Sequence, residues 1–153
     1  MTWYSSNEWR AIRGLAPDDP LPPTTEEWLE FVHPDDRERV VLCVERQKAG
    51  DPDYMTFEYR ERHKDGHWVW IECRGACVDW DEEGAPRRII GTDVDITSRK
   101  LAEEKIAHMS RRLKLALEVS HIGVFETDFD AGTSDWDDGM MTLFGIKGSQ
   151  RMQ

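Results

Sequence analysis

The alternation of hydrophobic and polar residues changes twice along this chain. Between residues 24 and 49 the apolar positions recur at helical spacing, which predicts two helices. The first follows an N-cap at Thr24 or Thr25 and ends at Pro34, because proline cannot continue a helix. The second ends at Gly50. Their apolar stripes are Trp28, Leu29, Phe31 and Val32 in the first helix, and Val40, Val41 and Val44 in the second.

After Gly50 the period becomes two, which is typical of β-strands. Three alternating runs cover residues 54–64, 67–80 and 87–96. Asp65-Gly66 between the first two runs is a strong hairpin signature. Three successive antiparallel strands behind two helices predict an α+β fold with one sheet and helices on one face.

The segment 97–120 returns to helical spacing. It contains no Gly or Pro and is rich in residues that favour helices. Its apolar residues fall at the spacing of coiled-coil core positions, at Ala102, Ile106, Met109, Leu113 and Ala116. A coiled coil between two copies is one interpretation, and an amphipathic helix lying on its own domain is the alternative.

The two ends of the chain share a pattern. Residues 3–15 and 134–146 each pass from a short strand through a Ser/Asp-rich cap into a short apolar helix that ends in Gly and an aliphatic residue. Only the second copy is preceded by a further strand-like run. We therefore expect the first domain to lack its first strand, and residues 121–136 to pair into the vacant edge, in the same chain or in a second copy. A disordered tail is the alternative.

Composition narrows the choice of partners. The net charge of −11 disfavours nucleic acid, because phosphate binding requires an excess of Lys and Arg. No apolar run of eighteen residues is present, so we expect no membrane contact within this chain. The three cysteines, Cys43, Cys73 and Cys77, have no paired spacing, which favours a reducing cytoplasm.

The order of several short motifs resembles the PAS domain, of the type whose C-terminal half is called the PAC motif. The motifs are "FVHPDDRERV", "FEYRERHKDGHWVWIECRG", "DEEGAPRRIIGTDVDITSRKLAEEKI" and the later "LEVSHIGVFETDFDAGTSDW". The resemblance implies a five-stranded antiparallel sheet with helices on one face, followed here by a long amphipathic linker helix. It divides the chain into a PAS domain lacking its first strand (1–97), a linker or signalling helix (98–119) and the beginning of a second PAS repeat (120–153).

The same resemblance implies a sensor or dimerisation module of a multi-PAS bacterial signalling protein. Sensor histidine kinases of two-component systems and diguanylate cyclases are the usual parents, and neither catalytic domain is present in this chain. Asp95, Ile96 and Thr97 match the Asp-Ile-Thr signature at which the last strand exits toward the effector. Asp95 can accept hydrogen bonds from the helix start, Thr97 or Ser98 can cap it, and Arg99 is spaced to pair with Asp95. We expect this junction to relay the signal.

No catalytic constellation is present, and we expect no enzymatic activity. His108 lies on the helix that is expected to pair, but it lacks the acidic residue and the proline that follow a phospho-accepting histidine. His33 precedes Pro34 and is interpreted as a capping or surface residue. His63 and His67 can face each other across the hairpin, but no carboxylate or thiol is in register, so we predict no metal site.

The cofactor is not identified by the sequence. Flavin-binding light sensors of the superfamily have a reactive cysteine in an Asn-Cys-Arg motif, and Cys43 does not match it. Haem-binding members have an axial histidine on the long helix, and segment 36–49 contains none. We therefore expect neither flavin nor haem, and either a small unidentified ligand or an empty core. The residues expected near a pocket are Trp28, Phe31, Val40, Val44, Phe57, Tyr59, Trp68 and Trp70.

Two functions follow from these observations. The first is a cytoplasmic sensory module that binds a small ligand or a partner and relays its state through the C-terminal helix. The alternative is a constitutive, ligand-free dimerisation module. Either would form a homodimer through the linker helix and the outer sheet face, since Trp68 and Trp70 share one face of their strand while Val69 and Ile71 share the other.

Overall fold

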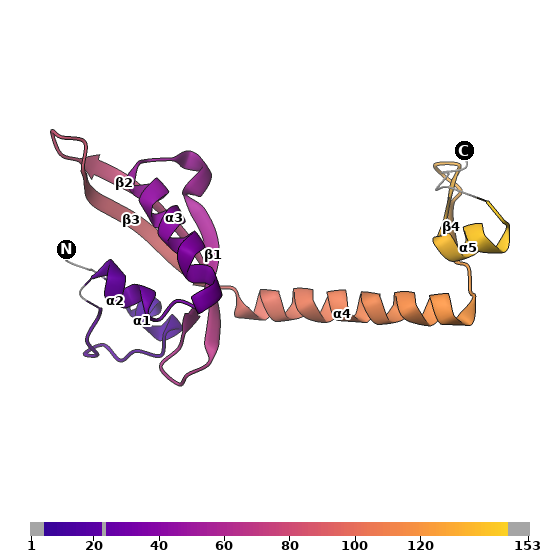
Figure 1. Ribbon diagram of the computed structural model, residues 1–153, viewed down its shortest axis with the longest axis horizontal. Helices are drawn as coiled ribbons and strands as arrows, with labels where there is room; N and C mark the ends of the chain where they lie inside the picture. The colour runs from indigo at the N-terminus through magenta and orange to yellow at the C-terminus, as the bar shows by residue number, and fades with distance from the viewer. Residues whose placement is uncertain (1–4, 23, 147–153) are drawn as a thin grey trace. The chain divides into compact units, whose positions relative to one another are not determined.

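The structure is a computed structural model that describes residues 5–22 and 24–146. The chain divides into two units, Met1–Leu101 and Ala102–Gln153, and each is described by itself. Figure 1 labels the helices and strands of both units. The α+β fold class predicted from the sequence is confirmed for the first unit, which combines short helices with an antiparallel sheet.

The helix starts of the first unit agree with the pattern, but the first predicted helix ends early: α2 stops at Leu29, and Phe31 and Val32, counted in its apolar stripe, lie in the segment that bonds to β1 (Thr56–Arg62). The Thr24 hydroxyl accepts a hydrogen bond from the Glu27 N–H (3.2 Å), so Thr24 is the N-cap of α2. Pro34 opens a short 3-10 turn rather than continuing that helix. The helical elements of this unit are α1 (Asn7–Ile12), α2 (Thr25–Leu29), η1 (Pro34–Asp36), α3 (Arg37–Lys48) and η2 (Pro52–Tyr54).

The sheet of the first unit has the order β1-β2-β3, and both pairs are antiparallel. The strands are β1 (Thr56–Arg62), β2 (Trp68–Trp80) and β3 (Pro86–Asp95). The implied count of five strands is therefore wrong for this sheet: three strands form it among the described residues. The outer edge of β1 is bonded by segment 31–33, through the isolated bridge Val32–Glu61 and the bonds from Arg62 N–H to Phe31 C=O and from His33 N–H to Arg60 C=O.

Alternation along β1 and the first half of β2 places every second side chain in the core. α3 packs against β1 and β2 (Figure 1), and α1 contacts β3. The core residues are thus supplied by α2, α3 and the inward face of the sheet, and burial of their side chains is the main stabilising contribution to this unit. The buried cluster consists of Trp28, Val32, Val40, Cys43, Phe57, Tyr59, Val69 and Ile71.

The long helix α4 (Thr97–Ser120) begins two residues after β3 ends, with only Ile96 between them. The described part of the second unit then continues through β4 (Phe125–Asp128), β5 (Thr133–Trp136) and α5 (Asp138–Leu143). β4 and β5 form a two-stranded hairpin of their own. The alternative of a disordered tail is therefore wrong for residues 125–136, and pairing of this tail into the vacant sheet edge, in the same chain or in a second copy, stays a prediction.

The two short helices of the predicted repeat, α1 and α5, share their cap geometry. Ser6 caps α1 and Asp137 caps α5, in each case by accepting a bond from the N–H three residues on. Both helices end in the same motif, with Gly14 and Gly145 at φ +69°. Leu15 N–H donates to Arg10 C=O and Ile146 N–H to Met141 C=O, both at 2.9 Å. The strand expected at Trp3 and Tyr4 lies outside the described residues.

No helix in the described part of the chain is long and apolar enough to cross a membrane.

Candidate functional site

A cavity of about 500 Å³ lies in the first unit, beside the hairpin end of β1. Its walls come from the end of α1, the proline-rich segment that follows it, α2 with Phe31, and the β1–β2 connection. The apolar wall is larger than the polar one. The described lining residues are Trp9, Leu15, Pro20, Pro22, Trp28, Phe31 and Gly66 on the apolar side, and Arg13, Asp19, Glu61, Arg62, His63 and Lys64 on the charged side.

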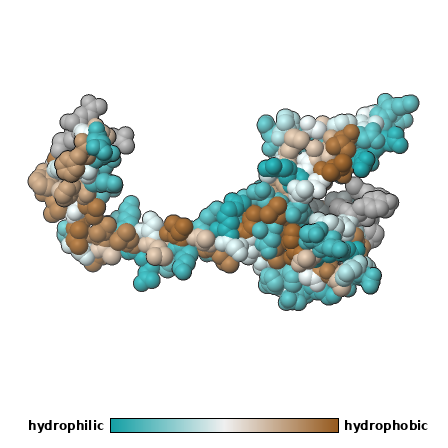
Figure 2. Space-filling model, turned by 180° about the vertical axis from the view of Figure 1, so that it is seen from behind, coloured by the Kyte–Doolittle hydropathy of each residue, from teal (hydrophilic) through white to brown (hydrophobic). Residues whose placement is uncertain are grey.

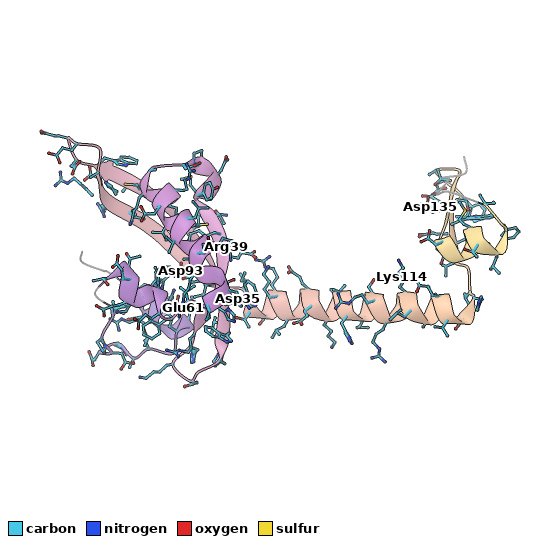
Figure 3. All side chains as sticks on the ribbon, viewed as in Figure 1. Asp35, Arg39, Glu61, Asp93, Lys114 and Asp135 are labelled. Carbon is cyan, nitrogen blue, oxygen red and sulfur yellow. The ribbon has the colours of Figure 1, made fainter. Side chains whose placement is uncertain are left out.

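A buried ionic network forms one wall of this cavity. Arg13, the C-cap residue of α1, is 5% exposed and donates two hydrogen bonds to the Glu61 carboxylate, from Nε (2.7 Å) and from Nη2 (3.0 Å). Its Nη2 also donates to Asp93 Oδ2 on β3 (2.6 Å). Figure 3 shows Glu61 and Asp93 next to each other in this unit. The guanidinium thus links α1, β1 and β3.

Two further side chains donate hydrogen bonds to Glu61. The Trp28 indole N–H (3.1 Å) and the Tyr59 hydroxyl (3.0 Å) both donate to Glu61 Oε2. The guanidinium of Arg13 also lies over the Trp9 ring, 3.7 Å from its centroid. Among the described residues, every buried side-chain nitrogen and oxygen has a hydrogen-bond partner. The network is therefore complete as it stands, as a buried charged group requires.

Burial and charge set the protonation states in this network. Burial alone would lower the pKa of Arg13, but interactions with Tyr59, Glu61 and Asp93 raise it above its ordinary value. The pKa of Tyr59 lies well above its usual value because the phenol is buried and because the charges of Glu61 and Asp93 disfavour a phenolate. Burial, followed by the charge of Asp93, likewise raises the pKa of the Cys73 thiol. Arg13 remains charged, and Tyr59 and Cys73 remain neutral, at physiological pH.

The junction between β3 and α4 is bonded to the sheet at several points. The Asp95 carboxylate accepts a hydrogen bond from Thr97 N–H (2.8 Å), as predicted for a residue at the helix start. Thr97 Oγ1 accepts from Trp70 N–H (2.9 Å), and Ile96 N–H donates to Trp70 C=O (2.9 Å). Ile96 is buried. The strand and the helix are therefore joined without a flexible break.

Ion pairs hold the first turn of α4 against β1 and β2. Arg99 donates to Glu58 of β1 (2.8 Å) and lies 3.4 Å from Glu72 of β2, and its expected pairing with Asp95 stays a prediction. Lys100 also pairs with Glu58. Hydrogen bonds from Lys100 and Arg99 outweigh the effect of burial and lower the pKa of Glu58.

The residues predicted to surround a pocket lie in three places. Trp28 and Phe31 line the cavity. Val40, Phe57 and Tyr59 belong to the hydrophobic core, and Val44 packs against it. Trp68 and Trp70 lie on the other face of β2, because Val69 and Ile71 occupy its core face. The Trp68 ring contacts the His33 ring at a tilt of 58°, and Trp70 lies beneath Arg60 and Lys100. Contact of any of the eight with a ligand stays a prediction.

Sequence analysis missed the charged network. The residue in the sequence that could have revealed this network is Glu61, which follows Phe57 and Tyr59 on the inward face of β1 by strict alternation. A carboxylate at a core position requires a buried partner, but Arg13 is 48 residues away and nothing in the local pattern identifies it.

The fold and the site together define an α+β domain in which a buried ionic network connects a cavity wall to the strand that enters a long helix. The profile of the family described as the PAS fold matches residues 2–93, which is more than half of the chain. The chain therefore belongs to the PAS fold family, as its motifs indicated.

The chain is similar to parts of bacterial signalling enzymes. The chain is 32% identical over 108 residues to a blue-light-activated histidine kinase of Brucella ovis, which covers 71% of this chain and 20% of that protein. It is 26% identical over 117 residues to the probable diguanylate cyclase DgcE of Escherichia coli K12, which covers 76% of this chain and 10% of that protein. The chain thus spans a fifth or less of these two curated relatives.

A solved structure agrees with this assignment. The crystal structure of a sensory box histidine kinase/response regulator from Burkholderia thailandensis E264 is 31% identical, with a TM-score of 0.58, over 71% of this chain and 79% of that one. The chain contains a PAS sensory domain of the kind found in histidine kinases and diguanylate cyclases.

Proposed function

We propose that this PAS domain binds a small molecule in the cavity beside α1 and α2 and relays the bound state to helix α4. One observation supports the proposal above the others. Arg13 and Glu61 line the cavity, and the same guanidinium is bonded to Asp93, two residues before Asp95 at the junction. A ligand that displaces Arg13 or Glu61 changes the position of β3 where α4 begins.

The lining indicates the class of ligand. The rings of Trp9, Trp28 and Phe31 favour a flat, largely apolar molecule. Arg62 and Lys64 at the hairpin end supply positive charge, and Lys64 is half-exposed in its pair with Asp19. We therefore expect a small aromatic or heterocyclic compound with an anionic group. Neither flavin nor haem is proposed, since the chain contains no Asn-Cys-Arg motif and α3 contains no histidine.

The cavity and the relay can be tested separately with anilinonaphthalene sulfonate, an aromatic anion whose fluorescence rises on binding. Leu15→Trp fills the cavity, and Leu42→Trp adds the same bulk on an exposed position of α3. We expect the first variant to weaken binding at least about tenfold and the second to leave it unchanged, because only the first removes apolar contact area. Equal binding of the dye by Leu15→Trp and the wild type would refute binding in the cavity.

The relay is tested with Asp93→Asn, which keeps the pair between Arg13 and Glu61. Nuclear magnetic resonance then follows the Trp70 and Ile96 amides, whose N–H groups bond at the junction. We expect the dye to shift both amide signals in the wild type and to shift them less than half as far in Asp93→Asn, at equal occupancy. Full shifts in the variant would show that Asp93 is not part of the relay.

A constitutive, ligand-free dimerisation module is the second candidate function. It is supported by the apolar residues of α4, of which Ile106, Met109 and Leu113 are each at least 60% exposed. Native mass spectrometry of the purified chain separates the two: a co-purifying small molecule supports sensing, whereas a dimer that stays empty supports this alternative. We also propose that either function operates in the cytoplasm, where Cys43, Cys73 and Cys77 remain free thiols.

A further inference from the structure

The β1–β2 hairpin brings two histidines onto one face at its base. His63 N–H donates to His67 C=O (2.8 Å), and Gly66 N–H donates to His63 C=O (2.8 Å), which closes a tight turn. The two residues are thus direct neighbours across the hairpin, and their side chains project from the same face. The imidazole rings stack with their centroids 4.3 Å apart and their planes 27° apart.

A carboxylate completes the group. Asp65 Oδ2 lies 3.5 Å from His63 Nδ1, and one ligand atom from each of His63, Asp65 and His67 lies within 4.8 Å of the other two. Two ligands of a tetrahedral zinc ion, each about 2.0–2.2 Å from the metal, are roughly 3.4 Å apart. His63 and Asp65 already have this separation. The sequence prediction of no metal site rested on the absence of a carboxylate in register, and Asp65 removes that premise.

The surroundings fix one ligand and leave the others accessible. The His63 ring occupies the space that a Cβ on Gly14 would need, with its Cε1 only 2.3 Å from that position. Lys64 N–H donates to Arg13 C=O (3.0 Å), which ties the loop to the end of α1. The Lys64 ammonium pairs with Asp19 (2.6 Å) rather than lying among the three ligands. The Asp65 side chain is 77% exposed, and His67 is also exposed, so both side chains can rotate toward an ion.

We propose that His63, Asp65 and His67 form a binding site for a divalent transition metal that prefers imidazole, with Zn²⁺ as the reference ion. Two neutral imidazoles and a carboxylate are ligands that Zn²⁺ takes in three-residue sites, where water occupies the fourth position. His63 Nδ1 also accepts a bond from Asp65 N–H (3.1 Å), and a metal on this nitrogen replaces that bond. The site lies at the cavity rim, since His63 and Gly66 line the cavity.

Titration of the tag-free, full-length chain with Zn²⁺ alone, against a chromophoric chelator, tests the site. We expect one ion per chain. His67→Asn and Asp65→Asn should each weaken binding at least about tenfold, since loss of a ligand costs no less than loss of a second-shell partner. His108→Asn, on an exposed position of α4, is the matched control and should bind as the wild type does.

The Hε1 resonances of the histidines provide an independent readout. Those of His63 and His67 should shift on addition of Zn²⁺, while those of His33, His108 and His121 stay in place. Both variants change exposed side chains, so we expect them to fold as the wild type does. Circular dichroism before titration checks this. Unchanged affinity in His67→Asn, or a loss of binding in His108→Asn, overturns the proposal.

Discussion

Arg13 shows how a single buried residue organises the sensory domain. Its Nε and Nη2 groups bond two carboxylates, and its Nη1 donates to Trp9 C=O (3.1 Å). A guanidinium suits this position because its donors are fixed in a fork that matches carboxylate geometry. Desolvation of the charge is offset only while both carboxylates remain in place, so the network specifies how α1 docks on the sheet.

We expect Arg13→Met to lower the free energy of unfolding by about 3–5 kcal/mol, because it leaves Glu61 and Asp93 buried near each other without a cation. Urea denaturation followed by tryptophan fluorescence measures this change. Arg39→Met is the control: its guanidinium is about half exposed and lies 3.7 Å from Asp36, so it should cost roughly 0–1 kcal/mol. A loss below 1 kcal/mol for Arg13→Met would show that the network contributes little to stability.

At the scale of elements, the first turn of α4 is joined to the sheet by hydrogen bonds and by ion pairs. Ile96 N–H donates to Trp70 C=O, the Thr97 hydroxyl accepts from Trp70 N–H, and Glu58 pairs with two successive cations of the helix. The two hydrogen bonds to Trp70 fix the position of the helix start, and the ion pairs resist its fraying. Of these two contributions to the stability of the helix start, only the ion pairs should vary with pH.

Glu58 provides that pH dependence. Its folded pKa is lowered by Lys100 and Arg99, so its stabilising effect is present above the unfolded value of 4.5 and is lost as the pH falls through the folded pKa. We expect the amide protection factor of Lys100, whose N–H bonds to Ile96 C=O, to fall about two- to fivefold between pH 6 and pH 3, the range of an exposed ion pair.

In Glu58→Gln the protection factor should already be low at pH 6 and should not change with pH. Glu104→Gln, one turn further along the exposed helix, serves as the matched control and should keep the pH dependence of the wild type. A pH dependence in Glu58→Gln equal to that of the wild type would assign the effect to another group.

The sequence predicted those parts of the fold that depend on local patterns. Phe57 and Tyr59 face the core because side chains alternate along a strand, and Thr24 caps α2 because its hydroxyl replaces a missing backbone acceptor. Of the residues expected near a pocket, Trp28 and Phe31 line the cavity, but its charged network was not predicted. Arg13 and Asp93 are 80 residues apart, and only the three-dimensional packing of α1 on the sheet brings them together.

At the scale of the whole molecule, α1 and α5 share the same local geometry. Both helices start at a side-chain cap and end in the same glycine motif, 131 residues apart by the positions Gly14 and Gly145. This likeness supports the expectation that the second unit begins a further PAS repeat, which stays a prediction. Helix α4 connects the two units along the chain.

The exposed apolar residues of α4 support the proposed pairing of this helix with a second copy, which can be tested directly. Figure 2 shows hydrophobic groups gathered along the helix among charged ones. Ile106 and Leu113 are 68% and 62% exposed at core positions of the heptad pattern, whereas Leu101 and Leu115, each 60% exposed, fall outside it. Burial of the first pair against a second copy is favourable, while burial of the second pair contributes nothing to a two-helix contact.

We therefore expect the double variant Ile106→Glu/Leu113→Glu to be monomeric and Leu101→Glu/Leu115→Glu to remain dimeric, as measured by light scattering at a concentration where the wild type is a dimer. Both variants add two charges at equally exposed positions, so a nonspecific effect of charge would change them alike. If both pairs dissociate the dimer, repulsion between acidic chains is the cause. If neither does, α4 is not the interface, and the outer sheet face with Trp68 becomes the contact to test.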